Sequence, residues 1–191
     1  NQKKSDYPHA VLSCLELYDP CDSRFLENIP RLSWRKRCIF RLMNQQSILS
    51  REAIHAWPKA ELHSHLDGAL RLNSILELAE KQDKMDLLPA TTMKTLEVEL
   101  AKVDDSEDLW DYLAWFDYTI AIMQTEEALS RVAYEMAEDF ARENVRYVEV
   151  RFGPVLHTAE GLSLEAVMEA VLDGLARARS DHGILSSVIV C

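Results

Sequence analysis

Residues 61–68 read Glu-Leu-His-Ser-His-Leu-Asp-Gly, and this stretch decides how the whole chain is interpreted. It predicts a short strand followed by a turn. Because side chains alternate along a strand, we expect one face to carry Glu61, His63, His65 and Asp67. Four ionisable or ligand-type groups on one face of a buried strand cost free energy unless they serve a purpose. The stretch therefore predicts a functional site at the carboxyl end of a strand.

His63 and His65 are the candidate metal ligands. Two imidazoles two residues apart on a strand can reach one ion, and imidazole nitrogen suits zinc. A His-x-His pair on its own is more often an ordinary pair of exposed or hydrogen-bonded histidines. Here the pair ends a strand and precedes Asp67-Gly68 and a predicted helix. This context favours a zinc site over an ordinary surface strand.

The downstream pattern predicts an α/β fold. Apolar residues at helical spacing predict helices that begin at Thr125 and Ser163, and residues 145–152 and 184–190 read as strands. Strands joined by helical crossovers imply a parallel sheet. We expect a (β/α)₈ barrel rather than an open doubly wound sheet. No Gly-rich phosphate turn follows the first strand, and polar residues gather at its carboxyl end.

Two further segments have expected structures. Ser74 and Glu77 have the spacing of a capping box at the start of a helix. Residues 82–106 are polar and irregular in pattern, so we expect no regular element there. Residues 107–123 return to a helical, aromatic-rich pattern.

The second strand carries charged residues whose role we expect to be structural. Glu149 and Arg151 share a face with Tyr147, which predicts an ion pair that faces the barrel interior. His157 follows this strand, where barrel enzymes place active-site loops. A loop histidine is more often exposed to solvent, so we expect His157 to be exposed.

The chain divides by composition near residue 57. The net charge of the 191 residues is −11, yet residues 1–57 are net basic and the remainder is net acidic. We expect residues 1–56 to form a flexible N-terminal extension and residues 57–191 to form the N-terminal part of an incomplete barrel. An acidic body disfavours a nucleic-acid partner, and no apolar run is long enough to cross a membrane. A small neutral or cationic ligand is the expected partner, and the oligomeric state is left open.

The cysteines indicate a reducing compartment. They show no Cys-x-x-Cys pair and no regular framework, and three of the four precede residue 57. We expect free thiols and a cytoplasmic protein, with a Cys14–Cys21 bridge as the alternative. The four positions are Cys14, Cys21, Cys38 and Cys191.

At this point the residues resemble a known family. Residues 58–70 are similar to the first-strand signature of adenosine deaminases, in the amidohydrolase superfamily. Residues 112–118 resemble the helical segment that covers the purine pocket in that family. Residues 131–135 and 147–154 are similar to the next helix and strand, and residues 186–191 resemble the third strand. The resemblance runs from about residue 57 to the end of the chain.

The resemblance implies a site and a reaction. His63 and His65 would bind zinc, His65 and Asp67 would border the nucleoside, and Asp67 would hold a ribose hydroxyl. Tyr112 and Phe116 would form the apolar wall around the purine, although a core-packing role suits both equally well. Zinc would lower the pKa of its bound water and so provide hydroxide for attack on C6 of adenosine or 2′-deoxyadenosine. The products would be inosine, or its 2′-deoxy form, and ammonia. The chain lacks the His-x-Glu and Pro-Cys-x-x-Cys motifs of cytidine-type deaminases.

The resemblance also implies that much of the site is missing. A complete barrel takes about 250 residues and eight strands, whereas this chain holds three predicted strands. The third zinc-binding histidine, the proton-shuttling glutamate and the later aspartates are expected beyond Cys191, so no general acid or base is assigned here. We expect an N-terminal fragment that is inactive alone. Deamination of adenine or of an N6-substituted nucleotide, and a non-catalytic purine-binding relative, are the alternatives.

Overall fold

The computed structural model describes residues 50–105 and 108–191, and the chain divides into two compact units, Asn1–Trp57 and Pro58–Cys191. In the first unit the described part is α2 (Arg51–Ala56), whose N-cap Ser50 accepts a hydrogen bond from the backbone N–H of Ala53 at 3.2 Å. This short helix was not expected from the sequence. The rest of the predicted extension, with Cys14, Cys21 and Cys38, lies outside the described residues.

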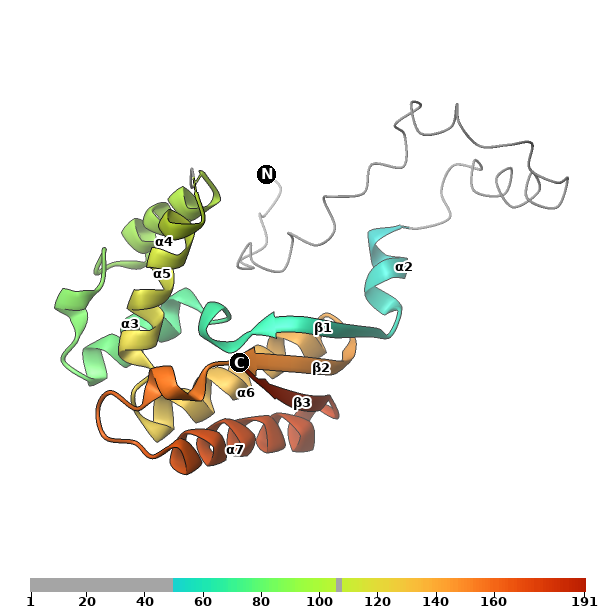
Figure 1. The fold of residues 1–191 in the computed structure, drawn as a ribbon. Coiled ribbons are helices and arrows are strands. Elements are labelled where there is room, and N and C mark those ends of the chain that lie inside the picture. The colour runs from blue at the N-terminus through green and yellow to red at the C-terminus, as the bar shows by residue number, and fades with distance from the viewer. Residues whose placement is uncertain (1–49, 106–107) are drawn as a thin grey trace, which may run out of the picture. The chain divides into compact units, whose positions relative to one another are not determined.

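The second unit alternates strands and helices (Figure 1). Its elements, in chain order, are β1 (Lys59–His65), η3 (Leu66–Gly68), α3 (Leu72–Lys81), η4 (Met85–Leu87), α4 (Met93–Ala101), η5 (Lys102–Asp105), α5 (Leu109–Ile122), α6 (Glu126–Arg142), β2 (Val145–Phe152), η6 (Pro154–His157), α7 (Leu164–His182) and β3 (Leu185–Val190), where η marks a 3₁₀ turn.

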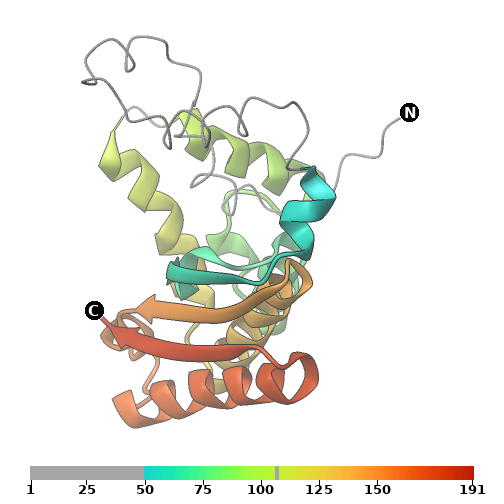
Figure 2. The same ribbon diagram turned by 90° about the vertical axis from the view of Figure 1, so that its right-hand side faces the viewer.

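The three strands form one parallel sheet in the order β1-β2-β3, as the turned view in Figure 2 shows. Their carboxyl ends therefore meet at one edge, where His65 pairs with Arg151 and Arg151 with Ile189. The helices α6 and α7 lie on one face of the sheet, and α3 and α5 lie beyond its carboxyl edge (Figure 1). This arrangement confirms the predicted parallel α/β fold.

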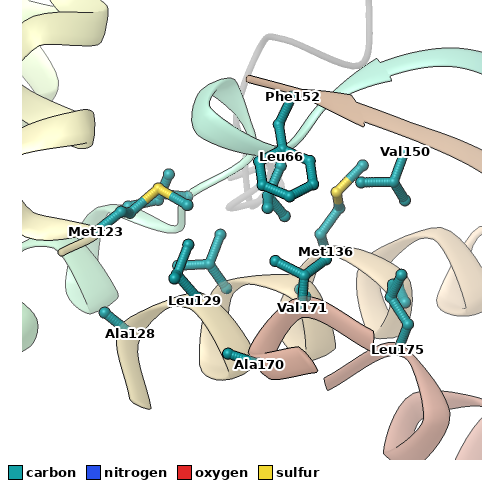
Figure 3. Packing of buried hydrophobic residues seen from close by; sticks show 14 of the residues in the cluster. Leu66, Met123, Ala128, Leu129, Met136, Val150, Phe152, Ala170, Val171 and Leu175 are labelled. Carbon is teal, nitrogen blue, oxygen red and sulfur yellow. The ribbon is translucent and has the colours of Figure 1, made fainter. Parts of the chain in front are cut away.

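The core lies between the sheet and the α6–α7 layer (Figure 3) and extends to buried residues of α3 and α4. Alternate side chains of β2, namely Val148, Val150 and Phe152, are at most 1% exposed and pack on the apolar stripes of the two helices. The helices approach so closely that a Cβ added to Gly174 would lie 2.1 Å from the carbonyl oxygen of Ser130. Glycine at this position is what allows the close approach.

The α6–α7 layer is also tied to α3 by charge. Arg71, at the start of α3, donates two hydrogen bonds to the carboxylate of Asp139 at 2.6 and 2.8 Å, and another to Glu138 at 2.6 Å. The Asp139 carboxylate raises the pKa of Arg71 further above its already high value. Arg131 similarly joins Glu135 and Glu77. These pairs fix the start of α3, which directly follows the turn η3.

The predicted boundaries of the later elements agree with the structure. Thr125 and Ser163 are the N-caps of α6 and α7, each accepting a hydrogen bond from a backbone N–H in the first turn. The helix α7 ends at Gly183, in the left-handed conformation with φ 71°. Asn144, two residues after the end of α6, is also in the left-handed region, with φ 61°.

Two predictions for the earlier segments are wrong. Ser74 does not cap α3, which begins at Leu72. Ser74 is buried within the helix. Its hydroxyl donates to Glu135 Oε2 on α6 at 2.5 Å and therefore does not cap the backbone of α3. The stretch 82–106 is not irregular throughout, since Thr92 caps the helix α4 and Leu96 of α4 is fully buried. One buried leucine was too weak a pattern to predict this helix.

The predicted Glu149–Arg151 ion pair is not formed. The two residues and Tyr147 do share the half-buried face of β2, but the Tyr147 hydroxyl lies 3.2 Å from Glu149 Oε1 and 3.1 Å from Ser187 Oγ. Arg151 Nε is buried without a hydrogen-bond partner among the described residues. The Tyr147 hydroxyl, on the same face of β2, contacts the Glu149 carboxylate in place of Arg151.

Two findings bear on the setting of the protein. Within residues 50–105 and 108–191, no helix is both long and apolar enough to cross a membrane. Cys191 carries an exposed, free thiol.

Candidate metal and nucleoside site

The carboxyl half of β1 departs from regular pairing. Glu61 pairs with Val148 but Ser64 pairs with Val150, so two residues of β1 oppose one residue of β2. Such an extra residue is a β-bulge, and it is stabilised here because Glu61 Oε1 accepts a hydrogen bond from the backbone N–H of His63 at 2.9 Å. The prediction that Glu61, His63 and His65 simply alternate on one face is therefore wrong at the bulge.

His63 and His65 nevertheless converge. Their rings lie 5.3 Å apart between centroids, and the two Nε2 atoms are 3.3 Å apart. Both side chains are exposed, so an ion can reach them. Two nitrogens at tetrahedral positions about 2.05 Å from zinc would be about 3.3 Å apart. The spacing of the two Nε2 atoms thus fits a zinc ion, although no group of three or more possible ligands occurs in the described part of the chain.

Asp67 lies just beyond these histidines in a different environment. The strand ends at His65 rather than at Leu66, and Asp67 belongs to the 3₁₀ turn η3. It is 7% exposed, and its Oδ1 lies 3.9 Å from His65 Nδ1, beyond hydrogen-bonding distance. This Oδ1 has no hydrogen-bond partner among the described residues. A buried acceptor without a partner is costly, which favours a ligand or water at this position.

The helix α5 brings one of the two predicted wall residues to this turn. A Cβ added to Gly68 would lie 3.3 Å from Phe116 Cε1, so the Phe116 ring rests against the turn that carries Asp67. Tyr112 lies one helical turn earlier, 45% exposed, with its ring 5.9 Å from that of Phe116. Phe116 is thus brought to the site, whereas Tyr112 stands at its outer margin.

His157 is the residue whose burial the sequence did not reveal. The prediction that it is exposed is wrong, because η6 turns it inward and it is 0% exposed. Its Nδ1 lies 3.0 Å from the carbonyl oxygen of Met123, and its ring packs 5.8 Å from that of Phe152. Burial lowers the pKa of this imidazole. The position directly after a β-strand was the available signal.

The comparisons with known proteins fit this geometry. The sequence model of the family described as adenosine deaminase matches residues 58–191. This chain belongs to the adenosine deaminase family. It is 44% identical over 140 residues to a probable adenosine deaminase of Dictyostelium discoideum, covering 73% of this chain and 18% of that protein. It is 42% identical over 133 residues to an adenosine deaminase of Clostridium botulinum, covering 70% and 39%. The chain thus spans well under half the length of these family members.

Solved structures of deaminases have the same fold. An adenine deaminase from Arthrobacter aurescens superimposes with a TM-score of 0.62 at 30% identity, covering 71% of this chain and 39% of that one. An Arabidopsis N6-mAMP deaminase gives a TM-score of 0.59 at 30% identity, covering 73% and 42%. These likenesses confirm the predicted (β/α)₈-barrel fold of the family, of which residues 50–105 and 108–191 hold three strands.

Proposed function

We propose that the protein carries out zinc-dependent hydrolytic deamination of adenosine and 2′-deoxyadenosine, in purine salvage in the cytoplasm. The observation that carries the proposal is the 3.3 Å spacing of His63 Nε2 and His65 Nε2 at the carboxyl edge of a parallel sheet. Membership of the adenosine deaminase family supports the reaction. The free thiol of Cys191 suits a reducing compartment.

The donor set suits zinc as the metal. Both candidate ligands are imidazoles, and their Nε2 atoms face each other. Two neutral imidazoles with lone pairs at this spacing repel each other unless a cation or a shared proton lies between them. Catalytic zinc sites use about three protein ligands and leave one position open for water. The described residues offer two such ligands; if the others come from later strands of the family's barrel, the 191-residue chain alone is expected to be inactive.

In the proposed reaction, zinc supplies the Lewis acidity that makes water nucleophilic near neutral pH. In the complete enzyme the oxygen of water would bond to C6 of the purine as the C6–N bond breaks; one hydrogen of the water would leave with the amino group as ammonia and the other would stay on the ring, which gives inosine. The described residues bind and orient the nucleoside. Asp67 accepts a hydrogen bond from a ribose hydroxyl, and Phe116 excludes water from one side of the base. Tyr112 extends this apolar wall outward.

A second candidate is deamination of a related purine. It is favoured by the structural likeness to an adenine deaminase and to an N6-mAMP deaminase. Asp67 discriminates between the candidates, because a carboxylate that accepts a ribose hydroxyl suits a nucleoside and repels a nearby phosphate. The third candidate, a non-catalytic purine-binding relative, predicts nucleoside binding without turnover.

The test uses the complete protein, with the downstream strands of the barrel. We expect about one zinc per chain, turnover of adenosine above adenine and N6-methyl-AMP, and loss of turnover on chelation that added zinc reverses. The double variant His63→Ala/His65→Ala should lose both zinc and turnover. The matched control is His55→Ala, at an exposed histidine of the other unit. Full zinc content in the double variant would overturn the proposal.

A further inference from the structure

Besides Arg151 Nε, two buried polar atoms have no hydrogen-bond partner among the described residues, and both are acceptors: Asp67 Oδ1 and His157 Nε2. Their residues come from different turns, η3 after β1 and η6 after β2, at the same edge of the sheet. Buried polar groups in native proteins are almost always satisfied. Two such exceptions close to one site call for a common explanation.

The hydrogen bonding of His157 fixes which of its nitrogens carries the hydrogen. Its Nδ1 is 3.0 Å from the carbonyl oxygen of Met123, which can only accept, so Nδ1 is the donor. Burial lowers the pKa of the ring and favours its neutral form. Nε2 then bears a lone pair and acts as an acceptor.

The turn η3, which carries Asp67, contacts β2, and η6 with His157 begins directly after that strand. The negative charge of the Asp67 carboxylate raises the pKa of His157, against the larger lowering by burial. Carboxylate and Nε2 are both acceptors and cannot bond to each other directly. A single water molecule, with two hydrogens to donate, is the smallest group that can satisfy both.

The polypeptide around His157 is held firmly. Gln124, 5% exposed, donates to the carbonyl oxygens of Ile120 at 2.8 Å and Leu156 at 2.9 Å, and its Oε1 accepts from the N–H of Ala159 at 3.0 Å. These bonds join η6 to the end of α5. His157, which belongs to η6, is therefore held in a fixed place relative to the end of α5.

We propose that His157 is a positioning residue for Asp67: through a shared water, His157 Nε2 fixes the Asp67 carboxylate in the orientation that receives the nucleoside. The inference rests on the proposed function for its substrate. It makes the loop after β2 part of the nucleoside site, although His157 itself does not touch the nucleoside. It also explains why a fully buried histidine lies beside the ring of Phe152.

Two conservative variants of the complete enzyme separate positioning from packing. The amide of His157→Asn stands where Nδ1 stood and keeps the bond to Met123, but loses the acceptor toward Asp67. The amide of His157→Gln reaches the position of Nε2 and keeps that acceptor, but loses the bond to Met123. We expect His157→Asn to lower kcat/KM for adenosine roughly 10- to 100-fold and His157→Gln to restore most of it, with zinc content unchanged in both.

A double-mutant cycle ties the effect to Asp67. If His157 acts through Asp67, then His157→Asn should cost little further in an Asp67→Asn background. For the monodeoxyadenosine that lacks the hydroxyl bound by Asp67, kcat/KM should likewise change little in His157→Asn. Should His157→Asn fail to fold, His157→Gln is compared with wild type alone: nearly unchanged kcat/KM supports the acceptor role of Nε2, and a loss as large as that of Asp67→Asn overturns it.

The outcomes are distinguishable from failure of the proposed function. A wild-type enzyme without zinc or turnover sinks the proposed function. An active, zinc-loaded wild type in which His157→Gln is as impaired as His157→Asn, or in which the losses with Asp67→Asn simply add, overturns the positioning role alone.

Discussion

The α6–α7 layer and the carboxyl edge of the sheet differ in whether their polar side chains have partners. In the helical layer each charged residue of the Arg71 cluster has a partner, as Arg71 has in Asp139 and Glu138. At the carboxyl edge of the sheet, Asp67 Oδ1 and His157 Nε2 are buried without a hydrogen-bond partner among the described residues. The Nε2 atoms of His63 and His65 face each other there at 3.3 Å. The two regions lie within one compact unit.

The difference teaches where to look for function. A scaffold lowers its free energy by satisfying its own polar groups, whereas a binding site leaves groups available for a ligand. Substitutions in the helical layer should therefore change stability, and substitutions at the edge of β1 should change zinc content and substrate kinetics. Four experiments on the complete enzyme test this division.

The largest effect is expected from Gly174→Ala in α7. Alanine normally stabilises a helix interior by up to about 1 kcal/mol relative to glycine. Here the new Cβ would lie 2.1 Å from the Ser130 carbonyl oxygen, so the helices must separate and we expect a loss of about 3 kcal/mol. Urea unfolding measures it, and the exposed Glu169→Ala in the same helix is the control. An unchanged midpoint for Gly174→Ala contradicts the close packing.

Arg71→Met should cost less, about 2 kcal/mol, because Asp139 and Glu138 lose their half-buried partner and keep only the more exposed Arg142 as a guanidinium partner. Lys102→Met is the matched control, since it removes an exposed ion pair with Glu99 that contributes about 0–0.5 kcal/mol. Thermal unfolding compares the two. Equal effects would show that the Arg71 cluster is only a surface feature.

Phe116→Ala should act on binding, with KM for adenosine rising about tenfold and kcat nearly unchanged, as for loss of uniform binding. Phe116 rests against the turn that carries Asp67, whereas Trp110 on the same helix is 78% exposed. Trp110→Ala is therefore the control and should leave KM unchanged. Steady-state kinetics measure KM and kcat. If Phe116→Ala lowers stability but leaves KM for adenosine unchanged, Phe116 has a packing role and not a binding role.

The smallest effect is a pH dependence of stability from His157. Burial lowers its folded-state pKa below the usual value of about 6.5. As pH falls through that value, the unfolded chain gains a proton that the folded chain does not, so folding stability decreases until the folded-state pKa is reached. Urea midpoints at pH 8 and pH 5.5 should differ more for wild type than for His157→Gln. A larger pH effect in the variant contradicts the buried neutral ring.

The contrast also explains which features the sequence could predict. Thr125 and Ser163 predicted the starts of α6 and α7 because capping is local and the apolar stripe is periodic. The prediction that Ser74 caps a helix failed because its hydroxyl bonds Glu135, which is 61 residues away in the sequence. The metal pair was predicted from its spacing together with its place at the end of a strand before Asp67-Gly68, and it stays a prediction. The burial of His157 was not, because it depends on contact with the far end of α5.

The bulge in β1 has a consequence for how the family can vary. Because of the bulge, the face of the sheet on which a residue before Glu61 lies does not dictate the face on which His63 and His65 lie. The floor of the barrel can therefore be repacked by substitutions upstream without rotating His63 and His65 away from each other. One inserted residue thus separates the selection that acts on folding from the selection that acts on metal chemistry.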